Sequence, residues 1–327
     1  MKYKDYLWIE NLIQQNFPLK ELSTYRVGGP AEYYIEPADE EQALAALKWA
    51  DEKKIEVYIL GGGSNVLIHD EGLKGLVINT KRLNKILSQG KKAQASKNSN
   101  KVIKKETSVA EEVTIFAQCG AQIDRIVDKC AELGYGGFEE FAGLPGTVGG
   151  AIFMNARAYG KSIADIIETV RVFKKNANGR WISKTYRREC LSFGYKSSPF
   201  QKERTFILEA TFKLKPVNSG KIKNLIEEYR QKRKELGQYV LPNAGCVFKN
   251  NRNFGKPTGM IIEELGLKGK KIGGAEIFNK HANFIVNTGN ATAQDIYNLI
   301  RLIENEVERR LGLKLEREIR LLGKWEE

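Results

Sequence analysis

The sequence predicts an α+β protein with a first half in two lobes and a C-terminal α+β domain. Near the N-terminus, apolar runs of strand length alternate with one segment of helical composition. The segment Lys215–Gly220 then combines proline, asparagine, serine and glycine, as domain linkers do. Two amphipathic segments of helical period follow this linker. At 327 residues the chain is long enough for two or three domains.

The elements of the first half can be placed by composition and period. We expect a helix over Asp39–Lys54 and another over Gln122–Leu133, which Gly134 would cap. A hairpin is predicted over 169–186, because two strand-like runs flank the Asn178–Gly179 turn. The other expected strands are a short one after the turn at 28–30 and the runs 57–60, 66–68, 73–78, 109–117 and 206–214.

The C-terminal part begins with a predicted amphipathic helix over Lys221–Leu236. A short helix is expected near Gly259–Leu265, followed by a further element at 271–278. A final helix should begin at Thr292 as its cap and end at Gly312. The last strand is predicted over Leu313–Leu322, where apolar and charged residues alternate except at Arg317.

The composition is that of an ordinary soluble protein, with 42% hydrophobic and 28% charged residues. No run of eighteen apolar residues predicts a transmembrane helix, and the N-terminal segment lacks the apolar core of a signal peptide. We therefore expect a cytoplasmic protein with free thiols at its four cysteines. These cysteines show no metal-ligand spacing, and with only two histidines no metal site is expected.

The net charge of +13 is compatible with nucleic acid, an acidic membrane surface or a phosphorylated small molecule. Much of the excess lies in the polar, aperiodic tract Lys91–Lys105, which we interpret as a solvated surface loop. A basic RNA-binding protein is the alternative from another functional class. No RNA-recognition aromatic block accompanies the charge, so we expect neither a nucleic-acid nor a membrane partner.

The glycine triplet Gly61–Gly63 follows a predicted strand and precedes Ser64 and Asn65. A dinucleotide-binding fingerprint needs a helix after its glycines, whereas Val66–Ile68 is typical of a strand, so this is not a Rossmann motif. Successive N–H groups of such a turn can form an anion-binding concavity, for which a pyrophosphate is the natural ligand. A plain tight turn is the alternative.

The stretch Phe141–Gly160 contains five glycines and one charged residue, Arg157. Glycine loses more backbone freedom on folding than any other residue, so this density is atypical of a core strand. It is typical of backbone that runs close against a flat or rigid group. The alternative is a buried crossover between two layers.

Seven blocks of the chain resemble, in order, the UDP-N-acetylenolpyruvoylglucosamine reductase (MurB) family, flavoenzymes of peptidoglycan synthesis. The resemblance extends from about residue 20 to the end of the chain. The blocks are STYRVGG (23–29), LGGGSNVL (60–67), GLPGTVGGA (143–151), NAGCVFKN (243–250), GLKG with IGGAE (266–276), HANF (281–284) and LEREIR (315–320).

The resemblance implies an FAD-binding domain of the vanillyl-alcohol-oxidase/PCMH type in two α/β subdomains, 1–80 and 81–216, and a substrate-binding domain, 217–327. It implies FAD and NADPH as cofactors, a UDP-sugar substrate and the shorter, type II form of the family; we expect a monomer. The residues that it assigns to FAD are Tyr25, Gly61, Gly62, Gly63, Ser64, Asn65, Val66, Leu67, Gly143, Gly146, Thr147, Gly149, Gly150, Ala151 and Asn155.

The family reaction reduces the enolpyruvyl ether of a UDP-sugar to a lactyl ether, with hydride from flavin N5 and a proton from the protein. The resemblance implies UDP-N-acetylmuramate as product and a role in cell-wall biogenesis, cell shape and cell division. An enolate-like centre needs fixed cationic or acidic donors, and its carbon needs a positioned acid. The resemblance assigns proton donation to Cys246, a serine position in the family, and enolate stabilisation to Glu318 and Lys196. Without it, Cys246 is a small buried hydrophobe and Glu318 belongs to a solvated strand face.

Two positions depart from the family pattern. Lys196 stands where the family has arginine, and lysine lacks the planar two-pronged contact with a carboxylate. Arg157 stands where the family usually has glycine, which suggests that it supplies the missing guanidinium. The substrate-binding candidates are Arg157, Arg233, Lys249, Asn250, Glu276 and His281, although His281 is equally well interpreted as a structural histidine. The alternative function is another FAD-dependent oxidase or dehydrogenase of the same cofactor fold.

Overall fold

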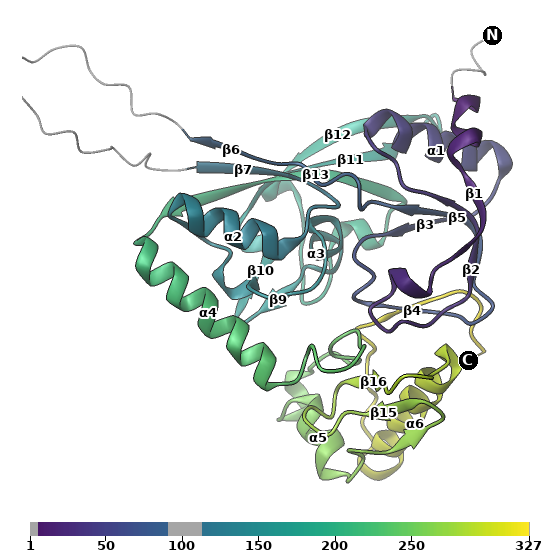
Figure 1. The fold of residues 1–327 in the computed structure, drawn as a ribbon, viewed down its shortest axis with the longest axis vertical. Helices are drawn as coiled ribbons and strands as arrows, with labels where there is room; N and C mark the ends of the chain where they lie inside the picture. The colour runs from purple at the N-terminus through teal and green to yellow at the C-terminus, as the bar shows by residue number, and fades with distance from the viewer. Residues whose placement is uncertain (1–5, 91–112, 327) are drawn as a thin grey trace, which may run out of the picture. The chain divides into compact units, whose positions relative to one another are not determined.

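The structure, a computed structural model, describes residues 6–90 and 113–326, whose course is drawn in Figure 1. The chain divides into two compact units. The first combines Met1–Arg82 with Gln231–Glu327, and the second is Leu83–Arg230. The second unit is therefore an insertion in the chain of the first. The basic tract Lys91–Lys105 lies outside the described residues.

The N-terminal part of the first unit is a four-stranded sheet with the order β1-β2-β5-β3. β1 (Gln14–Pro18) is antiparallel to β2 (Pro30–Ile35), whereas β5 (Leu73–Asn79) is parallel to β2 and to β3 (Val57–Leu60). Helix α1 (Glu40–Lys53) begins where the Asp39 carboxylate accepts the Gln42 N–H. These elements confirm the predicted helix at 39–54 and the predicted strands at 57–60 and 73–78.

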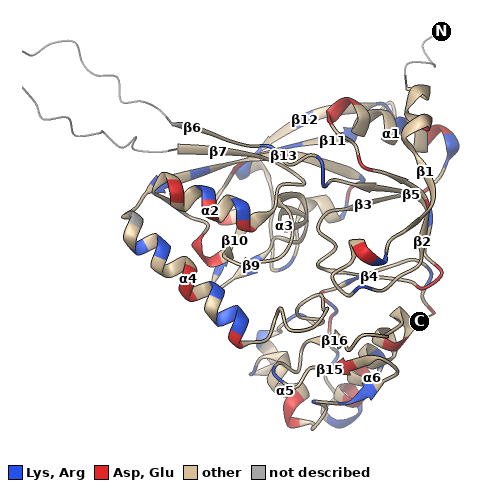
Figure 2. Cartoon of the chain, in the orientation of Figure 1, with Lys and Arg blue, Asp and Glu red and all other residues tan. Residues whose placement is uncertain are grey.

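The C-terminal part of the first unit packs helix α6 (Ala293–Leu311) against a small antiparallel sheet (Figure 1). The sheet order is β14 (Lys271–Ile272), β15 (Ala275–Ile277) and β16 (Ile285–Asn287), and α5 (Thr258–Glu264) also contacts α6. As predicted, Thr292 caps α6 and Gly312 ends it. Helix α6 carries both acidic and basic side chains (Figure 2), and the Glu306 carboxylate pairs with Arg309 and Arg310.

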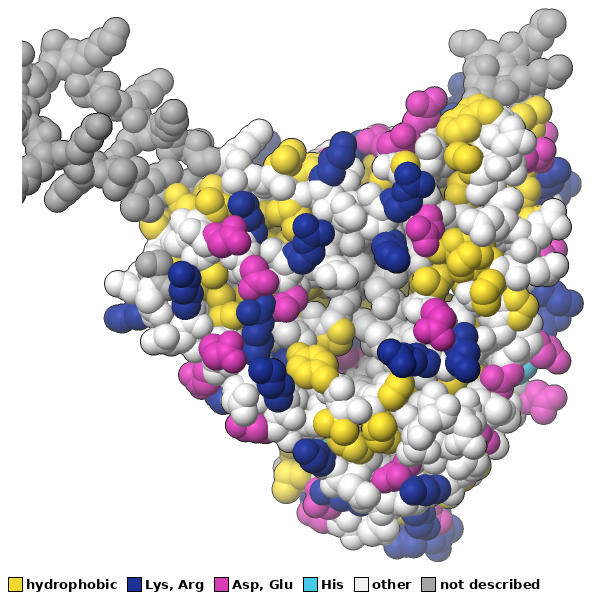
Figure 3. Space-filling model, viewed as in Figure 1, with side chains coloured by type: hydrophobic (Ala, Val, Ile, Leu, Met, Phe, Trp, Pro, Cys, Tyr) yellow, Lys and Arg dark blue, Asp and Glu magenta, His cyan; other side chains and the backbone are white. Residues whose placement is uncertain are grey.

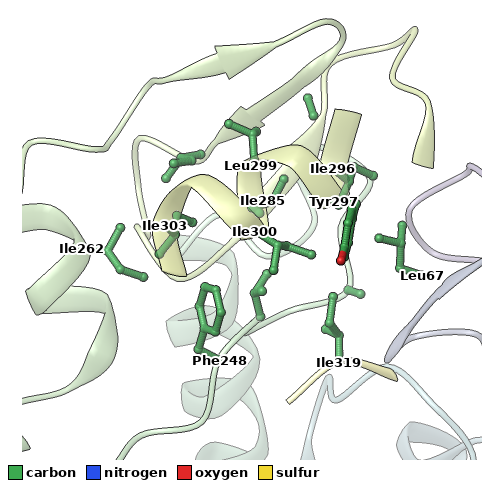
Figure 4. Close-up of a cluster of buried hydrophobic side chains, with 14 of the residues drawn as sticks. Leu67, Phe248, Ile262, Ile285, Ile296, Tyr297, Leu299, Ile300, Ile303 and Ile319 are labelled. Carbon is green, nitrogen blue, oxygen red and sulfur yellow. The ribbon is translucent and has the colours of Figure 1, made fainter. Parts of the chain in front are cut away.

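The core of the first unit draws on both of its chain segments. Figure 4 shows Leu67, from β4 (Val66–Ile68), beside Tyr297 of α6. Tyr25 and Val27 belong to the same buried cluster as Phe248 and the apolar face of α6. Strand β17 (Arg320–Leu322) pairs in parallel with β4 and so joins the C-terminal segment of the unit to its N-terminal segment.

The second unit is built on an antiparallel sheet with the order β12-β11-β13-β7-β6. These strands are β6 (Ile86–Gly90), β7 (Val113–Gln118), β11 (Ile167–Lys175), β12 (Trp181–Arg187) and β13 (Thr205–Pro216), and β8 (Tyr135–Gly136) pairs with β13. In the described part of the unit, the α-helices are α2 (Ile123–Leu133), α3 (Val148–Met154) and the first residues of α4 (Ser219–Glu235). The hairpin predicted around Asn178–Gly179 is confirmed as β11–β12.

The structure departs from the sequence predictions in several elements, two of which lie in segments assigned to the site. The strand expected over Leu313–Leu322 is reduced to β17, because its partner β4 is only three residues long. The glycine-rich stretch contains a helix, α3, that was not predicted. Its first N–H groups donate outside the helix, from Val148 to the Ala121 carbonyl and from Gly149 to the Cys119 carbonyl.

Basic and acidic side chains are interspersed over the described atoms of the face drawn in Figure 3. Among the described helices, none is long and apolar enough to cross a membrane.

Candidate active site

The glycine turn after β3 is fixed by the backbone of residues 22–24. Gly63 has a φ of +63°, and a Cβ there would lie 1.8 Å from the Leu22 carbonyl oxygen, so no other residue fits. The Thr24 N–H donates to the Gly63 carbonyl at 3.1 Å. The predicted strand Val66–Ile68 follows as β4, and its Leu67 is buried in the core. The segment assigned to FAD, 61–67, is thus one tight turn leading into a strand.

Two asparagines hold the loop that carries Cys246. The Asn243 carboxamide accepts the Gly245 N–H at 2.9 Å and donates to the Leu241 carbonyl at 2.7 Å. Asn283 accepts the Phe248 N–H at 3.0 Å and donates back to the Phe248 carbonyl at 2.8 Å. Asn283 is missing from the expected site residues although it lies in the HANF block. Its two hydrogen bonds to Phe248 depend on the approach of two loops, marked by an isolated bridge between Cys246 and Phe284, which the sequence does not display.

The Cys246 side chain is half-buried against Phe278, Phe284 and Val286. Tyr25, which was expected to contact FAD, is fully buried in the core of the first unit. Burial, and then the negative charge of a Cys246 thiolate, raise the pKa of the Tyr25 hydroxyl.

The backbone of Glu318 is hydrogen-bonded both to the loop that carries Cys246 and to the glycine turn. Its N–H donates to the Val247 carbonyl at 2.7 Å, next to Cys246. Its carbonyl accepts from the Asn65 carboxamide at 3.1 Å, next to the glycine turn. The first unit thus bonds Glu318 to Asn65 and to Val247, the residue after Cys246, although the three segments are far apart in the sequence.

In the second unit, the start of α3 presents two features that the chain's own packing does not use. The Thr147 hydroxyl is buried and has no hydrogen-bond partner among the described residues. Gly150 is exposed, and a Cβ there would meet only that hydroxyl, at 3.7 Å. At neighbouring Gly149, by contrast, a Cβ would lie 3.0 Å from the Cys119 Cβ. Gly149 serves internal packing, whereas Thr147 and Gly150 leave a polar atom and a space that fit a bound cofactor.

The remaining predicted FAD residues of this stretch have internal partners. The Gly143 N–H donates to Asp124 at 2.7 Å, and the Gly146 carbonyl accepts the Ile123 N–H at 3.1 Å. Ala151 is buried. These contacts hold the segment that precedes α3 against the start of α2.

The end of α3 is tied to the loop that carries Lys196. Asn155 ends the helix with a φ of +44°, and its carboxamide donates to the Gly194 carbonyl at 2.7 Å. The Gln201 side chain donates both to the Phe153 carbonyl and to the Lys196 carbonyl, at 2.8 and 3.2 Å. Lys196 itself has a φ of +52°, which is uncommon for a residue with a side chain. The second unit thus holds Asn155 and Lys196 in one framework.

Arg157 lies on the small hairpin of β9 (Arg157–Ala158) and β10 (Lys161–Ser162). Its side chain is exposed, and its guanidinium donates to the Gly160 carbonyl at 3.0 Å. Tyr159, in the turn, stacks on Tyr229 with ring centroids 4.3 Å apart. The guanidinium is therefore held close to the hairpin turn.

The substrate-binding candidates of the first unit all have contacts within the protein. Arg233 is buried and donates to the Gln238 side chain at 3.3 Å, while Lys249 pairs with Glu316. Asn250 accepts the Thr258 N–H at the start of α5, at 2.9 Å. Each of these side chains supports local structure in the described chain.

Glu276 and His281, the other two candidates of the first unit, also have contacts within the protein. Glu276 accepts from the Asn279 carboxamide at 2.9 Å and pairs with Lys271 at 3.2 Å. Burial lowers the pKa of His281, whose ring packs on Phe284 with centroids 4.4 Å apart. Its Nδ1 has no hydrogen-bond partner among the described residues. The packing of the ring supports a structural role for His281, and the unpartnered Nδ1 suits a contact with a ligand.

Two family models match the chain. Residues 31–183 match the FAD binding domain, and residues 217–322 match the C-terminal domain of UDP-N-acetylenolpyruvoylglucosamine reductase. The two matches together cover most of both units.

Similar proteins extend over nearly the whole chain. The UDP-N-acetylenolpyruvoylglucosamine reductase of Borrelia garinii subsp. bavariensis is 37% identical over 96% of this chain and 94% of its own length. The enzyme of the same name from Treponema denticola is 37% identical over 98% of this chain and 96% of its own length. The crystal structure of the Thermus caldophilus reductase superposes with a TM-score of 0.73 and 30% identity, covering 94% of this chain and 97% of that one.

Proposed function

Because the chain belongs to the UDP-N-acetylenolpyruvoylglucosamine reductase family, we propose that it reduces UDP-N-acetylglucosamine enolpyruvate to UDP-N-acetylmuramate with NADPH. It is an FAD-dependent oxidoreductase of peptidoglycan synthesis, with an FAD-binding domain followed by the family's C-terminal domain. The observation that supports the specific reaction is that Glu318 is hydrogen-bonded both to Asn65 of the glycine turn and to Val247, the residue that follows Cys246.

Within this fold we propose three functional regions. Residues 1–80 and 81–216 bind FAD, and residues 217–327 bind the substrate. When bound, FAD supplies hydride transfer from NADPH to the enolpyruvyl double bond. The N–H groups of Gly61–Asn65 would bind the pyrophosphate of FAD. The Thr147 hydroxyl would contact FAD, and the open position at Gly150 would leave room for it.

Cys246 would supply the proton. Hydride addition to the vinyl carbon distal to the ether oxygen leaves negative charge on the adjacent carbon and its carboxylate, and Sγ–H would protonate that carbon. Asn243 and Asn283 hold the loop in place while this occurs, since both bond to its backbone. The thiolate left on Cys246 then takes a proton from solvent.

Glu318 and Lys196 would stabilise the developing enolate. Glu318 acts as a fixed acidic donor on a segment whose backbone is hydrogen-bonded on both sides. Lys196 contributes a point charge from a constrained loop, and we propose that Arg157 adds the planar guanidinium that lysine lacks.

The UDP-sugar itself would be recognised by Arg233, Lys249, Asn250, Glu276 and His281. Two cations, Arg233 and Lys249, suit a diphosphate, and both are held by local contacts that orient them. We further propose that the enzyme acts in the cytoplasm as a monomer and that its product supports cell-wall biogenesis, cell shape and cell division.

One assay tests the proposal. The purified protein should contain FAD, oxidise NADPH only when UDP-N-acetylglucosamine enolpyruvate is added, and form UDP-N-acetylmuramate, identified by mass spectrometry. A flavin-containing protein whose NADPH oxidation ignores this UDP-sugar would overturn the assignment and favour another FAD-dependent oxidase or dehydrogenase.

A further inference from the structure

We propose that the Asn65 side chain is a positioning residue for Glu318, a role distinct from binding FAD. The inference rests on the proposed participation of Glu318 in substrate reduction. It concerns a residue that the sequence pattern assigns to the cofactor alone.

The geometry joins Asn65 to the Glu318 segment at two points. The carboxamide nitrogen of Asn65 donates to the Glu318 carbonyl at 3.1 Å. The Asn65 carbonyl accepts the Arg320 N–H at 3.0 Å. The parallel pairing of β4 with β17 begins at the next residue, with Val66 opposite Arg320. The Asn65 side chain therefore extends this ladder by one hydrogen bond, with an amide group of the side chain in place of a backbone N–H.

The opposite side of the same segment is also held. The Val247 carbonyl accepts the N–H of Glu318 at 2.7 Å and that of Ile319 at 3.4 Å. Glu318 thus has its N–H fixed by the residue that follows Cys246 and its carbonyl fixed by Asn65. With both peptide groups held, the Cα–Cβ direction of Glu318 is set, and only its side-chain rotamers remain to be chosen.

In this arrangement only the hydrogen bond from the Asn65 side chain to the Glu318 carbonyl can be removed by substitution. The other bonds to the segment come from backbone groups, which a substitution leaves in place. Aspartate has the same shape as asparagine but carries no N–H donor, and it would direct an oxygen at the Glu318 carbonyl. Small displacements of a catalytic group lower reaction rates strongly, because catalysis depends on alignment with the reacting atoms.

The experiment uses the FAD-loaded enzyme and separates its two half-reactions. Asn65→Asp and Asn65→Ala are assayed at saturating FAD, because Asn65 belongs to the proposed pyrophosphate-binding turn and its replacement can weaken FAD binding. At saturation we expect the rate of flavin reduction by NADPH to stay within about twofold of the parent. The rate at which the reduced enzyme converts the UDP-sugar should fall by about tenfold or more, with KM little changed. Ser64→Ala in the same turn is the contrast, and it should alter FAD affinity.

Three outcomes would decide against the inference. One is Asn65 variants that lose FAD affinity but convert substrate at the parental rate once saturated with FAD. Another concerns the double variant Asn65→Ala with Glu318→Gln. If its fold-loss in substrate reduction equals the product of the two single-variant losses, the residues act independently, whereas a residue acting through Glu318 should add little once Glu318 is altered. The third is parental substrate reduction in both Asn65 variants while Glu318→Gln is slow. If Glu318→Gln alone reacts at the parental rate, the role proposed for Glu318 fails instead.

Discussion

Cys246 stands where the related family has serine, and its surroundings allow a direct test of proton donation. Its loop is held by Asn243 and Asn283 through backbone contacts, so truncating the thiol should leave the loop in place. Cys246→Ala is expected to abolish reduction of the UDP-sugar, because no proton reaches the carbanionic carbon. Reduction of the flavin by NADPH should remain close to the parental rate. Rapid-mixing measurements of each half-reaction would show this split.

The matched control is Cys246→Ser, which installs the residue that the family uses and should retain substrate reduction. Equal losses of both half-reactions in Cys246→Ala would count against the donor role, because the proton donor acts in reduction of the UDP-sugar and not in reduction of the flavin by NADPH.

Arg157 and Lys196 form the second test at the residue scale. If Arg157 replaces the guanidinium that Lys196 lacks, Arg157→Gly should lower kcat/KM by about tenfold or more, the usual effect of losing a hydrogen bond to a charged group. Lys196→Arg in the Arg157→Gly background should restore most of that loss. Steady-state kinetics of both single variants and the double variant measure it. Parental kcat and KM in Arg157→Gly would rule out compensation.

Arg317 shows how one residue can break a pattern for a reason that lies elsewhere in the fold. It interrupts the apolar side of the C-terminal alternation, yet its guanidinium makes two hydrogen bonds to Glu304 of α6, at 2.5 and 2.7 Å. Those bonds, with the charge of Glu304, raise the pKa of Arg317 further. The exception in the sequence is thus an ion pair to the neighbouring helix.

At the scale of elements, acidic side chains anchor the N-terminal end of α6. Thr292 and Asp295 form a capping box at its start. The Asp70 carboxylate, from the turn between β4 and β5, accepts the N–H groups of Ala293 and Gln294 at 2.8 and 2.9 Å. A negative charge at this end of a helix is stabilising, and here it also ties the helix to the N-terminal segment.

Helix α3 supports a prediction that distinguishes two adjacent glycines. Gly150→Ala should stabilise the FAD-free protein by about 0.5–1 kcal/mol, because alanine is the better helix former and its Cβ has room. The same methyl group would occupy the space left for the cofactor, so FAD should bind more weakly. Thermal unfolding of the FAD-free protein and fluorescence titration with FAD measure the two effects.

Gly149→Ala is the control for this prediction. Its Cβ would press on Cys119, so it should lower the thermal stability of the FAD-free protein. Unchanged FAD affinity in Gly150→Ala would show that the open position does not face the cofactor.

At the scale of the whole molecule, the first unit is made from the two ends of the chain. Tyr25 and Leu67 share a core with α6, β17 pairs with β4, and the Asn287 carboxamide donates to the Tyr25 carbonyl at 2.9 Å. Residues 231–327 produced alone should therefore lack cooperative unfolding, because that core is left open. Co-production with residues 1–82 should restore it, as measured by circular dichroism and heteronuclear NMR.

An isolated 231–327 fragment that unfolds cooperatively by itself would contradict this expectation. It would show that the substrate-binding region proposed from the sequence is an autonomous folding unit despite the shared core.

Features that depend on a few neighbouring residues were determined by the sequence alone. Asp39, Gly134, Thr292 and Gly312 mark helix ends correctly, because capping is decided within a turn or two of the chain. The rejection of a Rossmann motif was correct for the same reason, since β4 directly follows the glycines. The ordered blocks likewise led to the right family.

The tertiary structure decided the features that depend on distant partners. Helix α3 forms in a glycine-rich stretch because carbonyl groups of residues 119 and 121 accept its first N–H groups. The C-terminal strand is short because β4 offers only three residues for pairing. Asn65 and Glu318 are joined across 253 positions of sequence. No local preference encodes such a bond, because it exists only once packing has brought the two segments together.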